Sequence, residues 1–241
     1  MLELNGVSKT FGGVKAVQDV SMSIASGEVR GLIGPNGAGK STLVNLISGL
    51  LRHSTGTISV DGQSVDRLSA HQRAERGIAR TFQNLRVFKS LTVQQNIEVA
   101  GYSGRASGRN ENTMLQEAIE RFDLADKLNA PAGSLAYGQL RRLEIVRALA
   151  LRPRLLMLDE PAAGMNEQET EDLREALGWV RSQSECAILV IDHDLKFIMA
   201  LSERITVLNL GAVIANGSPQ EVSENRQVID AYLGEDYEHA A

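Results

Sequence analysis

One short segment constrains the fold of this 241-residue chain more than any other. It reads Gly34-Pro35-Asn36-Gly37-Ala38-Gly39-Lys40-Ser41-Thr42, and it directly follows the apolar run Gly31-Leu32-Ile33. The residues after it place an apolar face at helical spacing, formed by Leu43, Leu46, Ile47 and Leu50. A strand, a glycine-rich turn of this spacing and a helix together predict a phosphate-binding loop, or P-loop.

The residue types in this loop suit the phosphates of ATP. Glycines allow backbone N–H groups to turn toward phosphate oxygens, and the helix N-terminus adds positive potential. We expect Lys40 to reach the β and γ phosphates and the Ser41 hydroxyl to bind Mg²⁺. Residues 34–42 are therefore the predicted ATP-binding segment.

Two carboxylates end a second apolar run, Leu155-Leu156-Met157-Leu158, at Asp159 and Glu160. Ligand sites in α/β proteins lie at such C-terminal strand edges. We expect Asp159 to hold Mg²⁺ through water, and Glu160 to orient or deprotonate the attacking water. A strand ending in a solvated acidic turn is the alternative, and the P-loop favours the catalytic interpretation.

Two further side chains are expected near the γ-phosphate. His193 follows the apolar run Ile188-Leu189-Val190-Ile191 and is placed to donate a hydrogen bond to a phosphate oxygen. Gln83 lies in a polar loop after a short strand within Gly77–Gln83, from which it reaches the metal or the water. Taken alone, Gln83 resembles an ordinary surface residue.

The segment Leu135-Ala136-Tyr137-Gly138-Gln139 precedes a helix that contains Leu143, Val146 and Leu149. We expect Gly138 to leave backbone amides accessible near the helix N-terminus, which would form a second anion-binding end. A single domain does not readily wrap one ATP with two helix starts so far apart. The segment is therefore predicted to bind the ATP of a partner subunit.

The remaining pattern predicts an α/β fold. Val20, Met22 and Ile24 alternate with serines, and Thr57–Val60 precedes the turn signal Asp61-Gly62, so the N-terminal part is predicted to hold antiparallel strands. The non-alternating runs are predicted to be buried parallel strands. Helical spacing recurs at Leu115, Ala118, Ile119 and Phe122, and residues 101–112 are expected to form a surface loop.

Composition narrows the class of partner. A net charge of −5 disfavours a broad basic face for nucleic acid. The lone Cys186 lies beside an apolar run and is expected to be a buried hydrophobe. Because no apolar stretch approaches the roughly 20 residues that cross a bilayer, and no signal peptide pattern is present, a cytoplasmic location is expected.

Together, the P-loop, Gln83, Leu135–Gln139, Asp159-Glu160 and His193 resemble the ABC ATPase family over essentially the whole chain. The resemblance implies one P-loop NTPase domain over 1–241, with a mostly parallel core and an N-terminal antiparallel β subdomain in 1–84 and 151–241, and a helical subdomain in 85–150. It implies a head-to-tail dimer of two cassettes, identical or merely similar. Each ATP then lies between the P-loop of one subunit and the Leu135–Gln139 segment of the other. It further implies that Phe11 stacks on adenine, the alternative being an aromatic residue of the core.

Within this family, residues 79–83, 135–145 and 159–166 resemble the ATPases of branched-chain amino-acid uptake systems and of related urea or short-amide importers. The closing Ala231–Glu235 is also similar to lipopolysaccharide-export ATPases. Three departures stand out. Ala136 replaces the usual serine, Asn166 replaces the usual aspartate, and the stretch 101–112 is shorter than the uptake group commonly carries.

The resemblance implies membrane partners that this chain does not contain: permease subunits and, indirectly, a solute-binding protein. The chain would then lie on the inner face of the cell membrane. We expect Val87 and Phe88, in Leu85-Arg86-Val87-Phe88, to form an exposed patch where a permease docks, with Arg86 steering the docking and Leu85 folded back as core. An exporter ATPase, a soluble cassette in cofactor assembly and an ATP-gated scaffold without hydrolysis remain alternatives.

Overall fold

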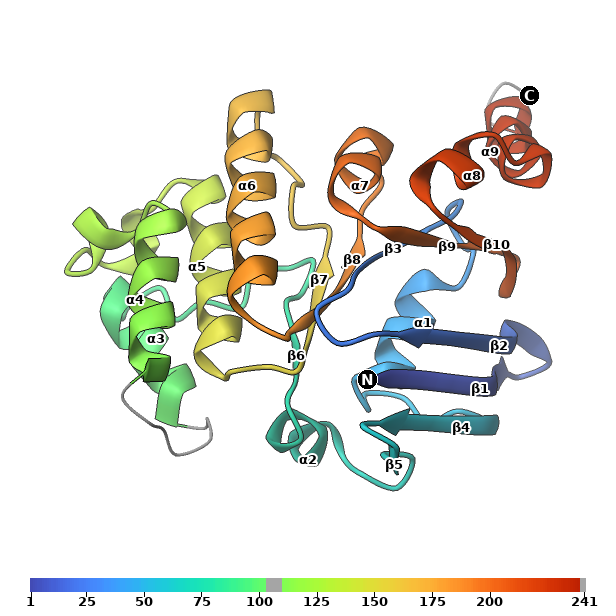
Figure 1. Cartoon of the computed structure of the whole chain (residues 1–241), viewed down its shortest axis with the longest axis horizontal. Helices are drawn as coiled ribbons and strands as arrows, with labels where there is room; N and C mark the ends of the chain where they lie inside the picture. The colour runs from blue at the N-terminus through green and yellow to red at the C-terminus, as the bar shows by residue number, and fades with distance from the viewer. Residues whose placement is uncertain (103–109, 239–241) are drawn as a thin grey trace.

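The computed structural model describes residues 1–102 and 110–238 and contains two β-sheets (Figure 1). A six-stranded sheet has the order β10-β9-β3-β8-β7-β6, and a four-stranded sheet has the order β2-β1-β4-β5. The strands are β1 (Leu2–Phe11), β2 (Val14–Ile24), β3 (Val29–Ile33), β4 (Thr55–Val60), β5 (Gln63–Ser64), β6 (Ile78–Arg80), β7 (Leu155–Asp159), β8 (Ala187–Ile191), β9 (Arg204–Asn209) and β10 (Ala212–Gly217).

The six-stranded sheet is the centre of the molecule. Every residue of β3, β7 and β8 is buried, as their unbroken apolar runs predict. Neighbouring strands from β9 to β6 are parallel, and only the edge strand β10 runs antiparallel. Because the parallel strands share a direction, the residues that follow them gather at one edge.

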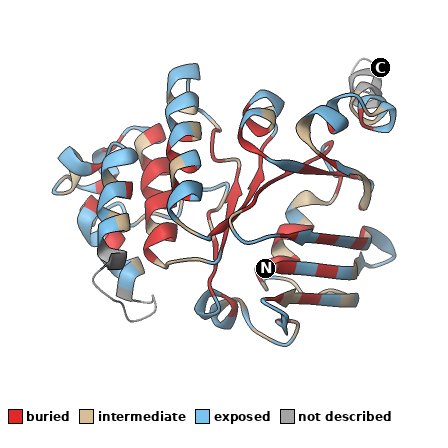
Figure 2. Ribbon diagram, viewed as in Figure 1, coloured by how far each residue is buried: buried red, intermediate tan, exposed pale blue. Residues whose placement is uncertain are grey.

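The four-stranded sheet is antiparallel, as expected for the N-terminal part, with β2 and β4 pairing on either side of β1. Its strands alternate buried and exposed residues, which Figure 2 shows as bands along β1, β2 and β4. The buried face shares a core with α1 and with alternate residues of the central sheet, including Leu155, Met157 and Leu189.

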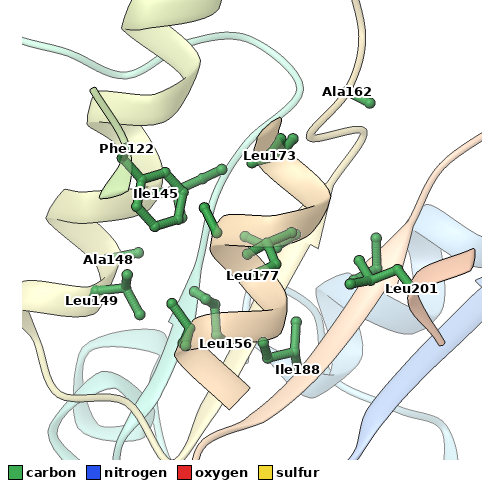
Figure 3. Close-up of a cluster of buried hydrophobic side chains, with 14 of the residues drawn as sticks. Phe122, Ile145, Ala148, Leu149, Leu156, Ala162, Leu173, Leu177, Ile188 and Leu201 are labelled. Atoms are coloured by element: carbon green, nitrogen blue, oxygen red, sulfur yellow. The ribbon is translucent and has the colours of Figure 1, made fainter. Parts of the chain in front are cut away.

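The other face of the central sheet packs against helices. Leu156 and Ile188 join Leu173 and Leu177 of α6 and Ile145 and Leu149 of α5 in a second core (Figure 3). The helices are α1 (Lys40–Ile47), α2 (Ala70–Glu75), α3 (Val93–Tyr102), α4 (Asn110–Arg121), α5 (Tyr137–Ala150), α6 (Glu167–Gln183), α7 (Leu195–Leu201), α8 (Pro219–Ser223) and α9 (Arg226–Glu238), with the 3₁₀ turns η1 (Ala125–Lys127) and η2 (Ala132–Ser134).

Two expectations about the helices need correction. Leu50 does not belong to the apolar face of α1, because the helix ends at Ile47 and Gly49 turns the chain at φ +78°, leaving Leu50 51% exposed. The expected loop 101–112 overlaps two helices at its ends, because α3 extends through Tyr102 and α4 begins at Asn110. Residues 103–109 of that stretch lie outside the described residues.

Cys186 is buried as expected, and burial raises the pKa of its thiol to about 12. In residues 1–102 and 110–238, no helix combines the length and apolarity that crossing a membrane requires. Helices α3, α4 and α5 lie together beyond the β6 edge of the sheet in Figure 1. The division into a core and a separate helical subdomain over 85–150 stays a prediction.

Candidate nucleotide and catalytic site

Four neighbouring strands deliver the predicted site residues to one edge of the central sheet. The P-loop follows β3, His193 follows β8, Glu160 follows β7, and Gln83 follows β6. These segments are far apart in the sequence, and the parallel pairing of their strands brings them together. The candidate site is therefore built on the most buried elements of the fold, which fixes its backbone positions.

The P-loop depends on glycine at two close backbone approaches. A β-carbon on Gly34, at φ +147°, would lie 2.0 Å from the carbonyl oxygen of Leu208. One on Gly39, at φ +102°, would lie 2.4 Å from the carbonyl oxygen of Ala16. Gly39 is the N-cap of α1 and supplies no capping side chain. The loop thus reaches the helix with its backbone amides turned by glycine rather than by side-chain caps.

Lys40 begins α1, and its ammonium group lies against the loop that precedes it. Nζ donates hydrogen bonds to the carbonyl oxygens of Gly34 and of Pro35, the latter at 2.9 Å. The cation is thus held at the concave side of the turn by short backbone contacts. A phosphate group in the loop would meet this cation together with the N-terminus of α1.

Asp159 is buried and already has a cationic neighbour that the sequence did not reveal. Its Oδ2 lies 2.8 Å from Nη2 of Arg80, and its backbone N–H donates to Oγ1 of Thr81 at 3.1 Å. Nη1 of Arg80 also donates to Oδ1 of Asn45 in α1 at 2.5 Å. Arg80 therefore links the carboxylate at the end of β7 to the helix that follows the P-loop.

Glu160 and Gln83 meet at the sheet edge. Nε2 of Gln83 donates a hydrogen bond to Oε2 of Glu160 at 3.1 Å. Glu160 adopts φ +50°, a left-handed conformation that is uncommon for residues other than glycine, and its N–H donates to the carbonyl of Ile191 at 2.7 Å. Backbone strain of this kind clusters at functional sites.

His193 lies at the same edge with an exposed side chain, while the neighbouring Asp192 is buried. Oδ2 of Asp192 accepts the N–H of Ala162 at 3.2 Å, and Oδ1 accepts the N–H of Asp194 at 3.0 Å. Asp192 therefore joins the loop after Glu160 to the turn that carries His193. Its place beside His193 in the sequence did not reveal this role.

The segment Leu135–Gln139, which we call the signature segment, surrounds the start of α5. Ala136 is the N-cap and has no side chain to cap the helix, but its N–H donates to Oε1 of Gln139 at 3.3 Å. The Tyr137 ring packs on Gly164, where a β-carbon would lie 3.0 Å from Cε1. Helices α5 and α1 are separated by β6 and β7 in Figure 1.

Gly138 is enclosed on one side, and its role at the anion-binding end stays a prediction. Gly138 is buried, and the carboxylate of Glu169 lies beside it, since a β-carbon on Gly138 would be 3.0 Å from Oε1. Glu169 stands in the first turn of α6 and accepts the N–H of Asn166 through Oε2 at 2.9 Å. The two helix starts pack together, so α6 covers Gly138 on one side.

Phe11 ends β1 and is 44% exposed, with Nζ of Lys9 4.8 Å from the ring centroid. The side chain is not part of either core. An exposed aromatic ring at this position agrees with a stacking role, which stays a prediction.

Within the segment Leu85–Phe88, the residues that face the core are not all those expected. Leu85 packs against the core as predicted, but Val87 does so too, because it faces inward between the exposed Arg86 and Phe88. Phe88 is 48% exposed, and the guanidinium of Arg147 lies 5.0 Å from its ring centroid. Beside it is a hollow of about 510 Å³, whose lining includes Arg80, Phe82, Arg86, Phe88, Glu144 and Arg147.

Beyond Asp192, three residues at the site escaped the sequence analysis: Arg80, Arg141 and Glu144. Arg80 follows two buried residues of a short strand, and an arginine in such a position needs a partner. Arg141 and Glu144 stand three residues apart on α5, a spacing that allows an ion pair. The positions of these charged residues in the sequence predict that each has a partner but do not identify which residue the partner is.

Comparison with known proteins shows the family to which this chain belongs. Residues 17–163 match the ABC transporter family, and residues 212–238 match a family described as branched-chain amino acid ATP-binding cassette transporter. The high-affinity branched-chain amino acid transport ATP-binding protein BraF of Pseudomonas aeruginosa is 41% identical, and the alignment covers 98% of each chain. The lipopolysaccharide export system ATP-binding protein LptB of Escherichia coli is 34% identical over 98% of each chain.

Solved structures of ABC transporter cassettes have the same fold. A nucleotide-free ATP-binding cassette from an ABC transporter superposes with a TM-score of 0.85 at 27% identity, covering 96% of this chain and 98% of that one. The ADP conformation of another ABC transporter cassette gives 0.83 at 28% identity, covering 97% and 98%. A dimeric bacterial cassette gives 0.79 at 26% identity, covering 91% and 99%.

Proposed function

Because the chain belongs to the ABC transporter family of ATP-binding, ATP-hydrolysing cassettes, we propose that it energises the uptake of branched-chain amino acids or a similar small polar solute. The observation that carries the assignment of its site is the pair formed by Gln83 and Glu160 beside the P-loop, with Nε2 and Oε2 3.1 Å apart. Relatives named for branched-chain amino acid transport are 41–42% identical over 98% of this chain. The relative named for lipopolysaccharide export is 34% identical, which favours import over export.

ATP is proposed to lie in the P-loop with its adenine on Phe11. Backbone N–H groups of the P-loop, in which Pro35 has none to donate, and the ammonium of Lys40 contact the phosphates, and the N-terminus of α1 points at them. Lys40 would exchange its present carbonyl contacts for phosphate oxygens. Phe11 offers an exposed ring that is not used by either core.

The donor set at the sheet edge fits Mg²⁺. Ser41 contributes a hydroxyl, Asp159 a carboxylate and Gln83 an amide oxygen, and oxygen is the ligand that this cation prefers. Within residues 1–102 and 110–238 no group of three acidic, histidine or cysteine side chains forms a metal site. One hydroxyl, one carboxylate and one amide oxygen suit an ion held largely by water and substrate phosphates, which supplies charge neutralisation at the γ-phosphate when bound.

Hydrolysis is assigned to the side chains around that phosphate. Glu160 accepts the proton of the attacking water, and Gln83 orients the Glu160 carboxylate through its amide N–H. His193 donates a hydrogen bond to a γ-phosphate oxygen from its exposed position after β8. The strained backbone of Glu160, fixed by its hydrogen bond to Ile191, holds the carboxylate at this place.

The signature segment is proposed to complete the site of a second cassette. Helix α5 lies across the sheet from α1, and its N-terminus carries Ala136, which offers no hydroxyl. The partner's ATP would therefore be bound by backbone amides and the helix dipole alone. Residues Leu135, Tyr137 and Gln139 frame this end, with Gln139 acting as the cap for the Ala136 N–H.

The partners beyond the second cassette are proposed to be permease subunits that dock at Phe88 and the hollow beside it, on the inner face of the membrane. The lining combines the exposed ring of Phe88 with side chains of Arg80, Arg86 and Arg147. The hollow lies next to the Gln83 loop, so a permease docked there would respond when that loop moves during hydrolysis. A solute-binding protein would act through the permease.

The central test compares Glu160→Gln with Glu167→Gln, a control on an almost fully exposed carboxylate at the first residue of α6. We expect Glu160→Gln to keep ATP affinity, to lose at least about 100-fold in turnover, and to form an ATP-dependent dimer in size exclusion. The control should match the unaltered protein. Turnover at the unaltered rate, or a monomer with bound ATP at high protein concentration, would refute the assignment.

The membrane partner is tested with Phe88→Ala and the control Ile229→Ala, which removes a similarly exposed apolar side chain from α9. In vesicles holding the assembled transporter, Phe88→Ala should reduce leucine uptake while the cassette's own ATPase rate stays near normal. Equal loss of both, with a lowered melting temperature, would mean that Phe88 stabilises the fold of the cassette rather than docking a permease. Transport of an outward-moving lipid instead of leucine would support the exporter alternative.

A further inference from the structure

A buried ion pair on α5 holds the loop that carries Gln83. Arg141 and Glu144 stand one turn apart, and Nη1 of Arg141 lies 3.2 Å from Oε2 of Glu144. Both side chains are more than nine-tenths buried. They lie a few residues past the signature segment, on the same helix.

The backbone of residues 82–86 wraps around this pair. Nη1 of Arg141 donates to the carbonyl of Phe82 at 2.7 Å, and Nη2 donates to the carbonyl of Gln83 at 3.0 Å. Oε1 of Glu144 accepts the N–H of Phe82 at 3.4 Å and that of Arg86 at 3.3 Å. The loop is therefore held through two of its acceptors and two of its donors by charged groups of one helix.

The same guanidinium reaches the signature segment. Nη2 of Arg141 donates to the hydroxyl of Tyr137 at 3.2 Å, and the Tyr137 ring packs on Gly164 in the loop after Glu160. Arg141 thus contacts the Gln83 loop on one side and the first residue of α5 on the other. The contacts connect the start of α5 to Gln83 by a short, packed route.

A pair buried this deeply is not explained by stability. Removing two charges from water costs several kcal/mol, and apolar side chains of similar size often stabilise such a site equally well. Burial raises the pKa of the Glu144 carboxyl, although the hydrogen bonds and Arg141 act in the opposite direction. What an apolar pair cannot supply is four directed hydrogen bonds to one loop, which fix its position relative to α5.

We propose that Arg141, oriented by Glu144, is a positioning residue that ties the placement of Gln83 to α5. ATP bound by a partner cassette at the signature segment then sets the position of Gln83 in this subunit's own site. The inference rests on the proposed dimer, in which one end of α5 faces the partner's ATP. It makes the two hydrolytic sites cooperative through a physical link inside each subunit.

The variants are Arg141→Gln, Arg141→Lys and Glu144→Gln, with Arg142→Gln as the matched control. Arg142 is also a buried arginine of α5, but its partners are Asp123 and Asp172, away from the Gln83 loop. Loss of a buried guanidinium is expected to lower the melting temperature of both arginine-to-glutamine variants. Only the Arg141 and Glu144 variants should change the loop.

The first measurement is amide hydrogen exchange in the full chain. In Arg141→Gln, the loop loses the two hydrogen bonds that Arg141 donates to its carbonyls, and Glu144, which accepts the N–H groups of Phe82 and Arg86, loses its cationic partner. The amides of Phe82 and Arg86 should therefore exchange about 10- to 100-fold faster. Glu144→Gln should give a smaller increase because its amide oxygen still accepts. If Arg142→Gln speeds the exchange of these amides as much as Arg141→Gln does, Arg141 does not hold the Gln83 loop in a specific way.

The second measurement is the ATPase rate against ATP concentration. The unaltered dimer should show a Hill coefficient that approaches about 2, the number of sites, and Arg141→Gln should fall to about 1 with kcat lowered about 10-fold or more. Arg141→Lys, which keeps the cation but not the planar fork, should recover part of the cooperativity. An unchanged Hill coefficient and kcat in Arg141→Gln would overturn the proposal.

Size exclusion separates this inference from the proposed function. The double variant Glu160→Gln with Arg141→Gln should still dimerise with ATP, because the contacts to phosphate remain. Failure of Glu160→Gln alone to dimerise would refute the proposed composite site. Normal dimerisation, together with unaltered exchange and cooperativity in Arg141→Gln, would refute only the role of Arg141.

Discussion

The N-termini of α1 and α5 are both proposed to face phosphate, yet they are built in different ways. The α1 end is shaped by glycines whose missing side chains allow the backbone of Ala16 and Leu208 to approach closely. The α5 end is shaped by side chains from elsewhere, with Tyr137 on Gly164, Glu169 beside Gly138, and Arg141 on the Gln83 loop.

The two helix ends should therefore respond differently to a partner. Backbone contacts at Gly34 and Gly39 leave α1 no room to shift against the sheet, so the P-loop is a fixed receptor. At the start of α5, Tyr137 and Glu169 make their contacts through side chains, which can change rotamer. The α5 end is therefore the one suited to move when a partner arrives, and alterations at the two ends should have unequal effects.

The largest difference is expected between Gly34→Ala and Gly138→Ala. In the first, the new β-carbon would meet a backbone oxygen at 2.0 Å, so we expect a loss of more than about 3 kcal/mol in the free energy of unfolding. In the second, it meets the tip of a flexible side chain at 3.0 Å, and a helical Gly→Ala change gains up to about 1 kcal/mol. Urea unfolding of both variants measures this, and equal losses would show that the α5 end is packed as rigidly as the α1 end.

Lys40→Ala removes a side chain from the fixed end. We expect ATP affinity to fall about 10- to 100-fold, the loss of a hydrogen bond to a charged group, with the fold intact. Fluorescent ATP binding reports the affinity, and Lys127→Ala, a surface change distant from the P-loop, serves as control. Retained affinity would place the phosphates away from Lys40.

Ala136→Ser alters the adaptable end by one hydroxyl. As N-cap, the serine oxygen can accept an N–H of the first turn, worth about 1 kcal/mol in the free energy of unfolding. The same hydroxyl can donate to a phosphate of the partner's ATP and tighten the closed dimer by at most about 1.5–3 kcal/mol. Higher stability with unchanged dimerisation would show that backbone amides already satisfy the phosphate.

The smallest effect is expected for Asn166→Asp. Asn166 caps α6 by accepting the N–H of Glu169 at 2.9 Å, and aspartate caps equally well, so the free energy of unfolding should change by less than about 0.5 kcal/mol. Thermal unfolding measures this. ATP-dependent dimerisation that increases in the aspartate variant would reveal a charge contact across the dimer that the asparagine does not make.

The same contrast explains what the sequence could predict. The P-loop, the buried strands β3, β7 and β8, and the convergence of Gln83, Glu160 and His193 follow from local patterns and one rule about parallel strands. Each signal lies within ten residues of what it positions. That is why the fixed end of the site was predictable.

The contacts at the α5 end could not be predicted from the sequence. The burial of Gly138 depends on Glu169, which arrives from the next helix, and the partner of Arg141 is a loop nearly sixty residues earlier. The prediction that Val87 is exposed was wrong for a similar reason. An apolar residue in a short loop gives no sign of which way its side chain faces. Tertiary contacts of this kind leave only a charge or a glycine in the sequence, without its partner.

The left-handed backbone at Glu160 has a consequence for the protein's thermal durability. Holding a non-glycine residue at φ +50° costs on the order of 1–3 kcal/mol. Glycine at position 160 would adopt the same conformation without that strain, so a variant library selected for heat resistance alone would be enriched in Glu160→Gly. Selection for heat resistance would thus remove the carboxylate proposed to accept the proton of the attacking water, and a screen for robust variants needs an ATPase assay beside the heat step.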